Sequence, residues 1–455
     1  TLHGYGIGRA LAGRIVEKYA EKAPIIITQN PYQLATDISR VGFRTADNIA
    51  RDVGIDRDHP DRADAAVLHL IREGESQGHC FLPRRELIER ALNLEVKAEH
   101  ASQAIERLTI AGRLIAHPAV DPEATPLYSP LLEQAEHMVS QRLHALRLAL
   151  DSAKPANPPM LQKVEEKTDI ALNEDQRRAV LMALSKGVTV ITGGPGTGKT
   201  TIVKLLIQMA TVRKENWLLA APTGRASRRL AEATNSEAKT IHRLLEFNGR
   251  TGGFSRTVSN PIEAHGVLID EASMVDVRLM SALLSAIPDG CRFVLVGDAD
   301  QLPSVGPGRI LGDIISSGQI PVCTLGEVYR QASDSGIVLN AHRINTGEAP
   351  ISGNHDNGRP DFFEIHRGES MEAQRTVLEI VTSRLPKRGF DPMTDIQVLT
   401  PMHSGVLGTE ALNTALQKAL NPEGPEIIRG HRTFRVRDRV IQLKNDYDND
   451  VFNGD

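Results

Sequence analysis

The chain has 455 residues, of which 40% are hydrophobic and 24% charged, and its formal net charge is -4. This length predicts about three or four domains rather than one core, and the composition is typical of a soluble globular protein. The charge excludes a global basic field, so a nucleic-acid partner would need a local basic groove.

Cysteine usage and the absence of targeting signals favour a cytoplasmic location. Cys80, Cys291 and Cys323 lie far apart without a C-x-x-C pair, which disfavours a zinc knuckle or a disulfide framework and suits a reducing compartment. No apolar run reaches the roughly 18 residues of a spanning helix, so no membrane contact is expected. The first residue is Thr1 and no signal-peptide pattern follows it, which predicts a fragment or a processed form.

Residues 1–60 predict short helices joined by glycine turns, in two similar copies. A glycine-rich stretch at 4–8 precedes a helix over 9–19, and the stretch 38–43 precedes a helix over 44–52. Each copy is similar to a helix-hairpin-helix motif, whose turn presents backbone N–H groups to a DNA phosphate. A helical bundle with purely structural glycine turns is the alternative.

Residues 61–150 predict a winged-helix-like domain followed by a linker helix. The evidence is a set of three helices, a short strand at 114–117 and a helix rich in Leu and Ala at 130–150. A scaffold or protein-docking module explains this layout better than sequence-specific DNA reading. The proline-rich stretch 152–159 is the clearest domain boundary. The three helices are predicted over 63–73, 84–92 and 98–111.

After residue 172, short apolar runs alternate with helical patterns. Such runs, bounded by turn residues, are typical of parallel strands buried on both faces. The region therefore predicts a doubly wound α/β fold. The runs lie at 188–192, 217–221, 267–270, 293–297 and 396–400.

The first of these strands leads into the sequence GGPGTGKT at 193–200, followed by a helix over 201–210. A strand, this loop and a helix are the context that a P-loop requires, so we expect an ATP site. Lys199 would contact the β- and γ-phosphates, and Thr200 would bind Mg²⁺. The remaining predicted ATP-binding residues of this segment are Gly194, Pro195, Gly196, Thr197, Gly198 and Thr201.

Polar residues at the ends of two further strands complete the predicted catalytic site. Asp270 would hold Mg²⁺, and Glu271 would orient or deprotonate the attacking water, since ligands bind at the carboxyl ends of such strands. Gln301, after the strand at 293–297, would sense the γ-phosphate or position water. Gln176, upstream of the P-loop, would read the adenine edge, although an ordinary surface glutamine would look the same.

Taken together, these stretches resemble superfamily 1 helicases, most closely their RecD-like branch. The segment GHCFLP at 78–83 and the tandem hairpin motifs also look like the front of stand-alone RecD-like helicases. The resemblance implies a multidomain protein with an α-helical N-terminal region and α/β RecA-like P-loop motor domains. The matching stretches are, in order, Gln176, GGPGTGKT at 193–200, LAAPTGRA at 219–226, KTIHRLL at 239–245, IDEASM at 269–274, GDADQLPSVG at 297–306 and VYRQ at 328–331.

The resemblance implies an ATP- and Mg²⁺-dependent DNA helicase that moves 5′ to 3′ on single strands, in DNA repair or recombination. Its partners would be single-stranded DNA and junctions of single- and double-stranded DNA. Arg330 would be an arginine finger that stabilises the transition-state charge. The stretch 247–265 would be a short hairpin pin that splits the duplex, or an ordinary surface loop. The implied DNA contacts are Thr223, Thr240, His242, Thr400 and His403.

The resemblance also predicts four parts: a tandem helix-hairpin-helix region at 1–60, a winged-helix-like domain at 61–150, a first motor domain at 160–345 and a partial second one at 346–455. The stretches 434–442 and 451–455 resemble the start of an inserted β-barrel, and two later family motifs do not occur, which puts turnover by this chain in doubt. The alternatives are an ATP-switched DNA-binding scaffold and the helicase part of a conjugative relaxase, although no histidine-rich nicking cluster occurs. The motor motifs alone also allow an RNA substrate.

Overall fold

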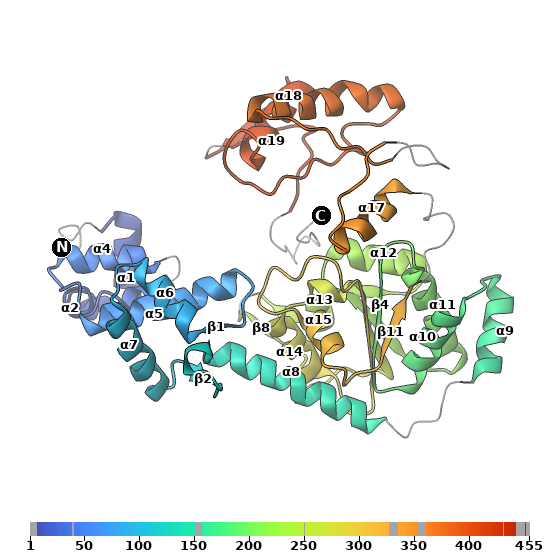
Figure 1. Cartoon of the computed structure of the whole chain (residues 1–455), viewed down its shortest axis with the longest axis horizontal. Coiled ribbons are helices and arrows are strands. Elements are labelled where there is room, and N and C mark those ends of the chain that lie inside the picture. The colour runs from blue at the N-terminus through green and yellow to red at the C-terminus, as the bar shows by residue number, and fades with distance from the viewer. Residues whose placement is uncertain are drawn as a thin grey trace. The chain divides into compact units, whose positions relative to one another are not determined.

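The computed structural model (Figure 1) describes residues 7–38, 41–150, 157–249, 251–326, 335–353, 361–430, 432–442 and 451. The chain divides into two compact units, Thr1–Val328 and Tyr329–Asp455. None of the helices in the described ranges is long and apolar enough to cross a membrane.

The first unit begins with a cluster of short helices. Helices α1 (Arg9–Tyr19) and α4 (Phe43–Asp52) confirm the two helices predicted from the repeated pattern, and α2 (Ala23–Gln29) and α3 (Gln33–Asp37) lie between them in the chain. Their apolar side chains share one small core, which includes Ile15, Ile27, Leu34 and Ile49.

The next segment contains the three predicted helices and a small three-stranded sheet, of which the sequence predicted one strand, at 114–117. Antiparallel pairing joins the strands in the order β1-β3-β2. A buried ion pair fastens this segment to α4: Arg62 is 4% exposed and donates to both carboxylate oxygens of Asp47. The elements are α5 (Pro60–Ser76), β1 (Phe81–Pro83), α6 (Arg84–Leu92), α7 (Ala98–Ile110), β2 (Ile115–Ala116) and β3 (Pro126–Tyr128).

A six-stranded sheet forms the centre of the remainder of this unit. Every strand pair in it is parallel, and the strand order is β11-β4-β10-β9-β5-β6. Four predicted strands are confirmed, as β4, β5, β9 and β10, whereas the two edge strands β6 and β11 were not predicted. The strands are β4 (Val188–Gly193), β5 (Trp217–Ala221), β6 (Ala238–Thr240), β9 (Gly266–Ile269), β10 (Arg292–Gly297) and β11 (Val322–Leu325).

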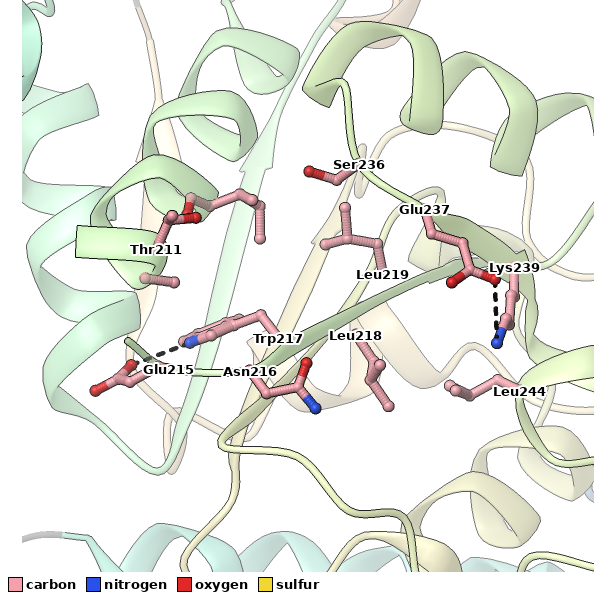
Figure 2. Close-up of a pocket in the computed structure, with 12 residues that line it drawn as sticks. Thr211, Glu215, Asn216, Trp217, Leu218, Leu219, Ser236, Glu237, Lys239 and Leu244 are labelled. Atoms are coloured by element: carbon pink, nitrogen blue, oxygen red, sulfur yellow. Dashed lines mark hydrogen bonds and ion pairs between the residues drawn. The ribbon is translucent and has the colours of Figure 1, made fainter. Parts of the chain in front are cut away.

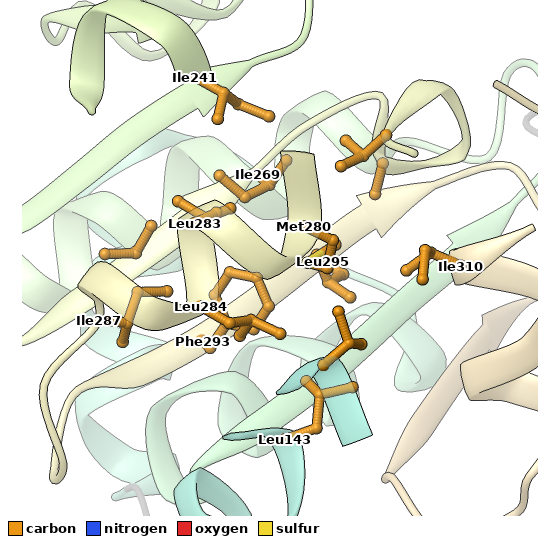
Figure 3. Packing of buried hydrophobic residues seen from close by; sticks show 14 of the residues in the cluster. Leu143, Ile241, Ile269, Met280, Leu283, Leu284, Ile287, Phe293, Leu295 and Ile310 are labelled. Carbon is orange, nitrogen blue, oxygen red and sulfur yellow. The ribbon is translucent and has the colours of Figure 1, made fainter. Parts of the chain in front are cut away.

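Helices cover both faces of this sheet. Successive residues of each strand point to opposite faces, and because both sets are apolar, each face has a hydrophobic core. Phe293 and Leu295 of β10 belong to one core, while Val294 and Val296 belong to the other. Figure 3 shows the first core, in which Phe293 packs beside Leu284 and Ile287. The helices of the first core are α8 (Pro130–Ala149), α13 (Ile241–Leu244), α14 (Val277–Ala286) and α15 (Ile310–Ser316), and those of the second are α9 (Pro158–Thr168), α10 (Glu174–Ser185), α11 (Lys199–Val212) and α12 (Gly224–Thr234).

Helix α8 precedes the proline-rich stretch, yet it packs on the sheet that follows. Its Leu143 and Leu146 are buried in the first core. Arg142 donates to the carbonyl oxygens of Leu284 and Ile287 at the end of α14, at 3.3 and 2.7 Å. The change of sequence pattern near 152–159 is therefore not the boundary of the domain built on the six-stranded sheet.

The second unit contains α17 (Gly336–Asn345), α18 (Ser370–Glu379), α19 (Thr409–Leu420) and an antiparallel pair, β12 (Glu426–Arg429) and β13 (Arg432–Arg435). The strand predicted at 396–400 is wrong, since these residues form no strand and Leu399 is 87% exposed. A parallel strand needs neighbours on which to pair. Within the described part of this unit, only β12 and β13 pair, so no RecA-like sheet is seen there.

Candidate nucleotide site

The P-loop connects β4 to α11, as predicted. Gly196 and Gly198 have positive φ angles of 76° and 83°, which glycine adopts without steric cost. A Cβ at Gly193 would lie 2.8 Å from Oγ1 of Thr197. The turn therefore depends on glycine at these positions, and α11 begins directly after it at Lys199.

The start of α11 presents groups that suit a phosphate. The first N–H groups of a helix have no intrahelical acceptor and lie at the positive end of its dipole. Nζ of Lys199 donates to the carbonyl oxygens of Gly193 and Gly194, the latter at 3.0 Å, which holds the ammonium group against the loop. Thr200 is exposed in the first turn, and Thr201 follows it half-buried.

Gln176 lies in the first turn of α10 and is fully buried. Its side-chain nitrogen donates to the carbonyl oxygen of Thr197 at 3.1 Å, and its side-chain oxygen accepts from the backbone N–H of Asn173 at 3.2 Å. The amide thus braces the P-loop as part of a capping box. Its predicted role in reading adenine stays a prediction.

The two predicted carboxylates follow β9 directly. The backbone N–H of Asp270 donates to the carbonyl oxygen of Ala220 on β5 at 2.9 Å. Burial raises the pKa of the Asp270 carboxyl; the N–H of Glu271 opposes this rise, the Glu271 charge adds to it, and the Lys199 ammonium opposes it. Lys199 and Asp270 both follow parallel strands of this sheet, and the Lys199 charge acts on the Asp270 carboxyl.

The backbone at Glu271 is held in an uncommon conformation. Its φ of 52° is left-handed, which costs free energy in a residue other than glycine or asparagine and is frequent at functional sites. A Cβ at Gly297, where β10 ends, would lie 3.3 Å from the backbone nitrogens of Ala272 and Ser273. Glycine at that position therefore lets β10 run close to the segment after Glu271.

The loop after β10 carries the predicted Gln301, whose side chain is exposed. Oγ1 of Thr192, near the end of β4, accepts from the backbone N–H of Ala299 at 3.1 Å. Asp298 is 4% exposed, and its side chain accepts from the N–H of Asp300 at 3.1 Å. These contacts fix the base of the loop and leave Gln301 directed away from the core.

Strands β4, β10 and β9 are adjacent and parallel, so the segments that follow them meet at one edge of the sheet. The structure thus brings the P-loop, the two carboxylates and the Gln301 loop to that edge. Arg330 lies outside the described residues.

The predicted DNA contacts of the first unit have structural roles in the local fold. Oγ1 of Thr223 accepts from the N–H of Ala226, and Oγ1 of Thr240 accepts from the N–H of Arg243, each at 3.2 Å, so both threonines cap helices. Each hydroxyl keeps a proton that can be donated to a phosphate. Burial lowers the pKa of His242, which favours a neutral ring.

His242 packs against a short hairpin formed by β7 (Phe247–Asn248) and β8 (Gly253–Phe254). Its ring centroid lies 5.6 Å from that of Phe247 and 5.7 Å from that of Phe254. A two-stranded hairpin therefore exists within the stretch 247–265, and its role as a pin stays a prediction.

In the second unit, Oγ1 of Thr400 donates to the carbonyl oxygen of Leu407 at 2.6 Å, and Nδ1 of the exposed His403 lies 3.5 Å from Oγ1 of Thr409. Each residue is held within a turn before α19. Their DNA contacts stay predictions.

A separate pocket of about 290 Å³ lies at the other end of the sheet (Figure 2). It adjoins Trp217, the first residue of β5, whereas the nucleotide site follows the last residues of the strands. Nε1 of Trp217 donates to Glu215 at 3.1 Å, and Glu215 also pairs with Arg292 at 3.3 Å. These contacts hold the amino ends of β5 and β10 together, which is a structural role.

Two threonine hydrogen bonds that hold the site together were not predicted, although Thr197 itself was predicted to bind ATP. Thr192 ties β4 to the loop after β10, and Oγ1 of Thr197 donates to the carbonyl oxygen of Gly194 at 2.9 Å within the P-loop. The Thr197 hydrogen bond could have been predicted, because its two residues lie close together in the sequence. The Thr192 hydrogen bond could not, because it spans 107 residues.

Family models match three parts of the chain: an "AAA domain" over residues 176–307, an "ATP-dependent RecD2 DNA helicase HHH domain" over 1–81 and an "ATP-dependent RecD-like DNA helicase SH3 domain" over 412–455. The last match overlaps the segment predicted to begin an inserted β-barrel.

Curated relatives agree with these matches. The ATP-dependent RecD2 DNA helicase of Deinococcus radiodurans is 33% identical over all of this chain and 62% of its own length. The RecBCD enzyme subunit RecD of Mycobacterium tuberculosis is 36% identical over 50% of this chain and 42% of its own length. The crystal structure of Pif1 helicase from Candida albicans aligns with 23% identity and a TM-score of 0.32, over 46% of this chain and 55% of that one.

The chain thus spans 62% and 42% of the lengths of these two curated relatives. The HHH, AAA and SH3 matches follow one another in the order that the sequence predicts. Along its whole length the chain is similar to RecD-like helicases.

Proposed function

We propose that this chain is the motor of an ATP-dependent DNA helicase that moves 5′ to 3′ along single-stranded DNA and opens junctions of single- and double-stranded DNA. The observation that carries the proposal is the meeting of the P-loop, Asp270-Glu271 and the Gln301 loop at one edge of a parallel sheet. The names of the RecD2 relative and of the HHH match support DNA as the substrate.

The residues at this edge fit ATP and Mg²⁺. The glycine turn and the start of α11 suit phosphate oxygens, and Lys199 is held at the loop by its carbonyl oxygens. The exposed hydroxyl of Thr200 and the carboxylate of Asp270 are the oxygen donors that Mg²⁺ prefers. A bound cation would also favour the ionised form of Asp270, whose pKa burial raises.

Glu271 and Gln301 would act on the water that attacks the γ-phosphate. Glu271 follows the metal-binding position directly, so we assign it as the general base, and Gln301 as the group that orients water or senses the γ-phosphate. Arg330 would supply positive charge to the transition state. Nucleotide-dependent closure of two motor domains would change the grip on DNA, with Thr223, Thr240, His242, Thr400 and His403 as contacts.

The test compares Lys199→Ala with Lys167→Ala, which changes an exposed lysine on α9. ATP hydrolysis is measured with and without single-stranded DNA, and strand displacement on duplexes with a 5′ or a 3′ tail. We expect Lys199→Ala to lose ATP hydrolysis and Lys167→Ala to keep it. The unmodified chain and Lys167→Ala should displace strands only from the duplex with a 5′ tail. Hydrolysis retained in Lys199→Ala would refute the site. Hydrolysis without displacement would favour an ATP-switched scaffold, and equal displacement from both tails would refute the polarity.

A further inference from the structure

The Gln301 loop is held at its far end by the N-terminal helical segment. The backbone N–H of Gly308 donates to the carbonyl oxygen of Gly78 at 3.0 Å, in the turn between α5 and β1. Gly308 has a φ of 96°, and a Cβ there would lie 2.3 Å from Cγ2 of Val277 and 3.1 Å from Sγ of Cys80. The backbone of the loop therefore passes between α14 and this turn with no room for a side chain.

The start of α14 holds the same loop from its other side. The backbone N–H of Val277 donates to the carbonyl oxygen of Pro307 at 3.0 Å. A Cβ at Gly306 would lie 2.1 Å from Oδ2 of Asp276, the residue that caps α14. Oγ of Ser304 lies within 3.0 Å of the carbonyl oxygens of Gly306 and Gly308. Few residues separate Gln301 from this anchored segment.

A side-chain contact joins the two sides of this anchor. The Glu75 side chain, in the last turns of α5, is 12% exposed and pairs with Arg278 on the first turn of α14. Glu75 also accepts a hydrogen bond from Oγ of Ser129, directly before α8. The largely buried carboxylate thus links α5, α8 and α14 at the point where the loop is held.

We propose that Glu75 and Arg278 are positioning residues: together with the Gly78–Gly308 hydrogen bond, their ion pair holds the loop that presents Gln301 to the γ-phosphate. This inference rests on the proposed function. The helical segment would then set the rate of the hydrolytic step through the loop, while ATP binding depends on the P-loop. A group that acts on the transition state and not on the ground state changes kcat with little change in KM.

The test uses Arg278→Ala, Arg278→Lys and the charge exchange Glu75→Arg with Arg278→Glu, in the full chain. We expect Arg278→Ala to lower kcat of DNA-stimulated ATP hydrolysis about tenfold, with KM for ATP and the affinity for a fluorescent ATP analogue unchanged within about twofold. Arg278→Lys should recover most of the lost rate, and the charge exchange only part of it, because an arginine at position 75 cannot accept the hydrogen bond from Oγ of Ser129.

Arg142→Ala is the matched control, because Arg142 contacts the opposite end of α14. It should lower thermal stability and leave kcat per folded molecule unchanged. An equal loss of kcat in Arg142→Ala, or no loss in Arg278→Ala, would overturn the positioning role.

Hydrogen exchange supplies a readout that needs no hydrolysis. In Arg278→Ala, a peptide covering 302–309 should exchange faster than in the unmodified chain, and a peptide covering β4 should not. Unchanged exchange at 302–309 refutes the anchor even if ATP is hydrolysed. A chain that fails to hydrolyse ATP at all refutes the proposed function, while the exchange result still decides whether Arg278 holds the loop.

Discussion

The two ends of the six-stranded sheet differ in what their polar residues do. At the carboxyl ends, the half-buried Asp270 has a carboxyl whose pKa burial raises, and Glu271 has a left-handed backbone conformation. At the amino ends, Glu215 is satisfied by Arg213, Trp217 and Arg292. The carboxyl ends carry unfavourable features that a ligand would relieve. At the amino ends the charges are paired within the protein, although Nε of Arg292 is buried without a hydrogen-bond partner and burial lowers the pKa of its guanidinium. Substitutions at the first should alter chemistry, and substitutions at the second should alter stability.

The largest expected effect is that of Glu271→Gln. Removal of a general base typically slows a reaction about 100- to 10,000-fold, so hydrolysis should nearly cease. Affinity for ATP and the melting temperature should stay close to those of the unmodified chain. Single-turnover hydrolysis and binding of a fluorescent ATP analogue measure this, with the exposed Glu263→Gln as the control. A large fall in melting temperature would break the contrast between the two ends.

Gly266→Ala tests the amino end. The new Cβ would lie 2.4 Å from a ring atom of Trp217, and overpacking of this kind costs about 1–3 kcal/mol. Denaturant unfolding should show this loss, while kcat per folded molecule is retained. Gly368→Ala, where a Cβ meets nothing within 4 Å, should change neither quantity. Loss of kcat with full stability in Gly266→Ala would show that the amino end takes part in the chemistry.

The smallest expected effect is a gain in stability from Asp270→Asn. Because burial raises the carboxyl pKa in the folded state, the ionised group destabilises the fold at pH values above that pKa, and the penalty disappears as the pH falls through it. Without ATP and Mg²⁺, the variant should melt about 2–4 °C higher near neutral pH. The difference should shrink on acidification. Asp52→Asn, at an exposed residue, is the control. A lower melting temperature in Asp270→Asn would contradict the conclusion that the ionised Asp270 destabilises the fold.

Sequence patterns predicted the parts of the fold that depend on local information. The strands at 188–192 and 293–297 were predicted because they are apolar on both faces, and the P-loop because its glycines and Lys199 act within one turn. The edge strand β6 was missed because it has only three residues and includes the exposed Lys239. The strand predicted at 396–400 is an error of the opposite kind, because an apolar run forms a strand only where other strands are present to pair with it.

The site was predicted less fully than the fold. Asp270 and Glu271 stand beside each other and follow a recognisable strand, so their shared location was evident. The hydrogen bond from Gly308 to Gly78 joins residues far apart in the chain, so no local sequence pattern predicts it. Contacts of this kind depend on how the helical segment packs against α14.

Helix α8 decides where a separately produced motor could start. Its residues Leu132, Val139, Leu143 and Leu146 fill one face of the sheet, and a Cβ at Gly187 would lie 1.9 Å from the carbonyl oxygen of Leu146. A protein that starts at the proline-rich stretch would lack the helix that covers this face of the sheet, and Phe293 and Leu284 of the same core would be exposed to water. A fragment that keeps this core intact therefore begins ahead of Pro130 and includes α8, which the sequence pattern assigns to the preceding region.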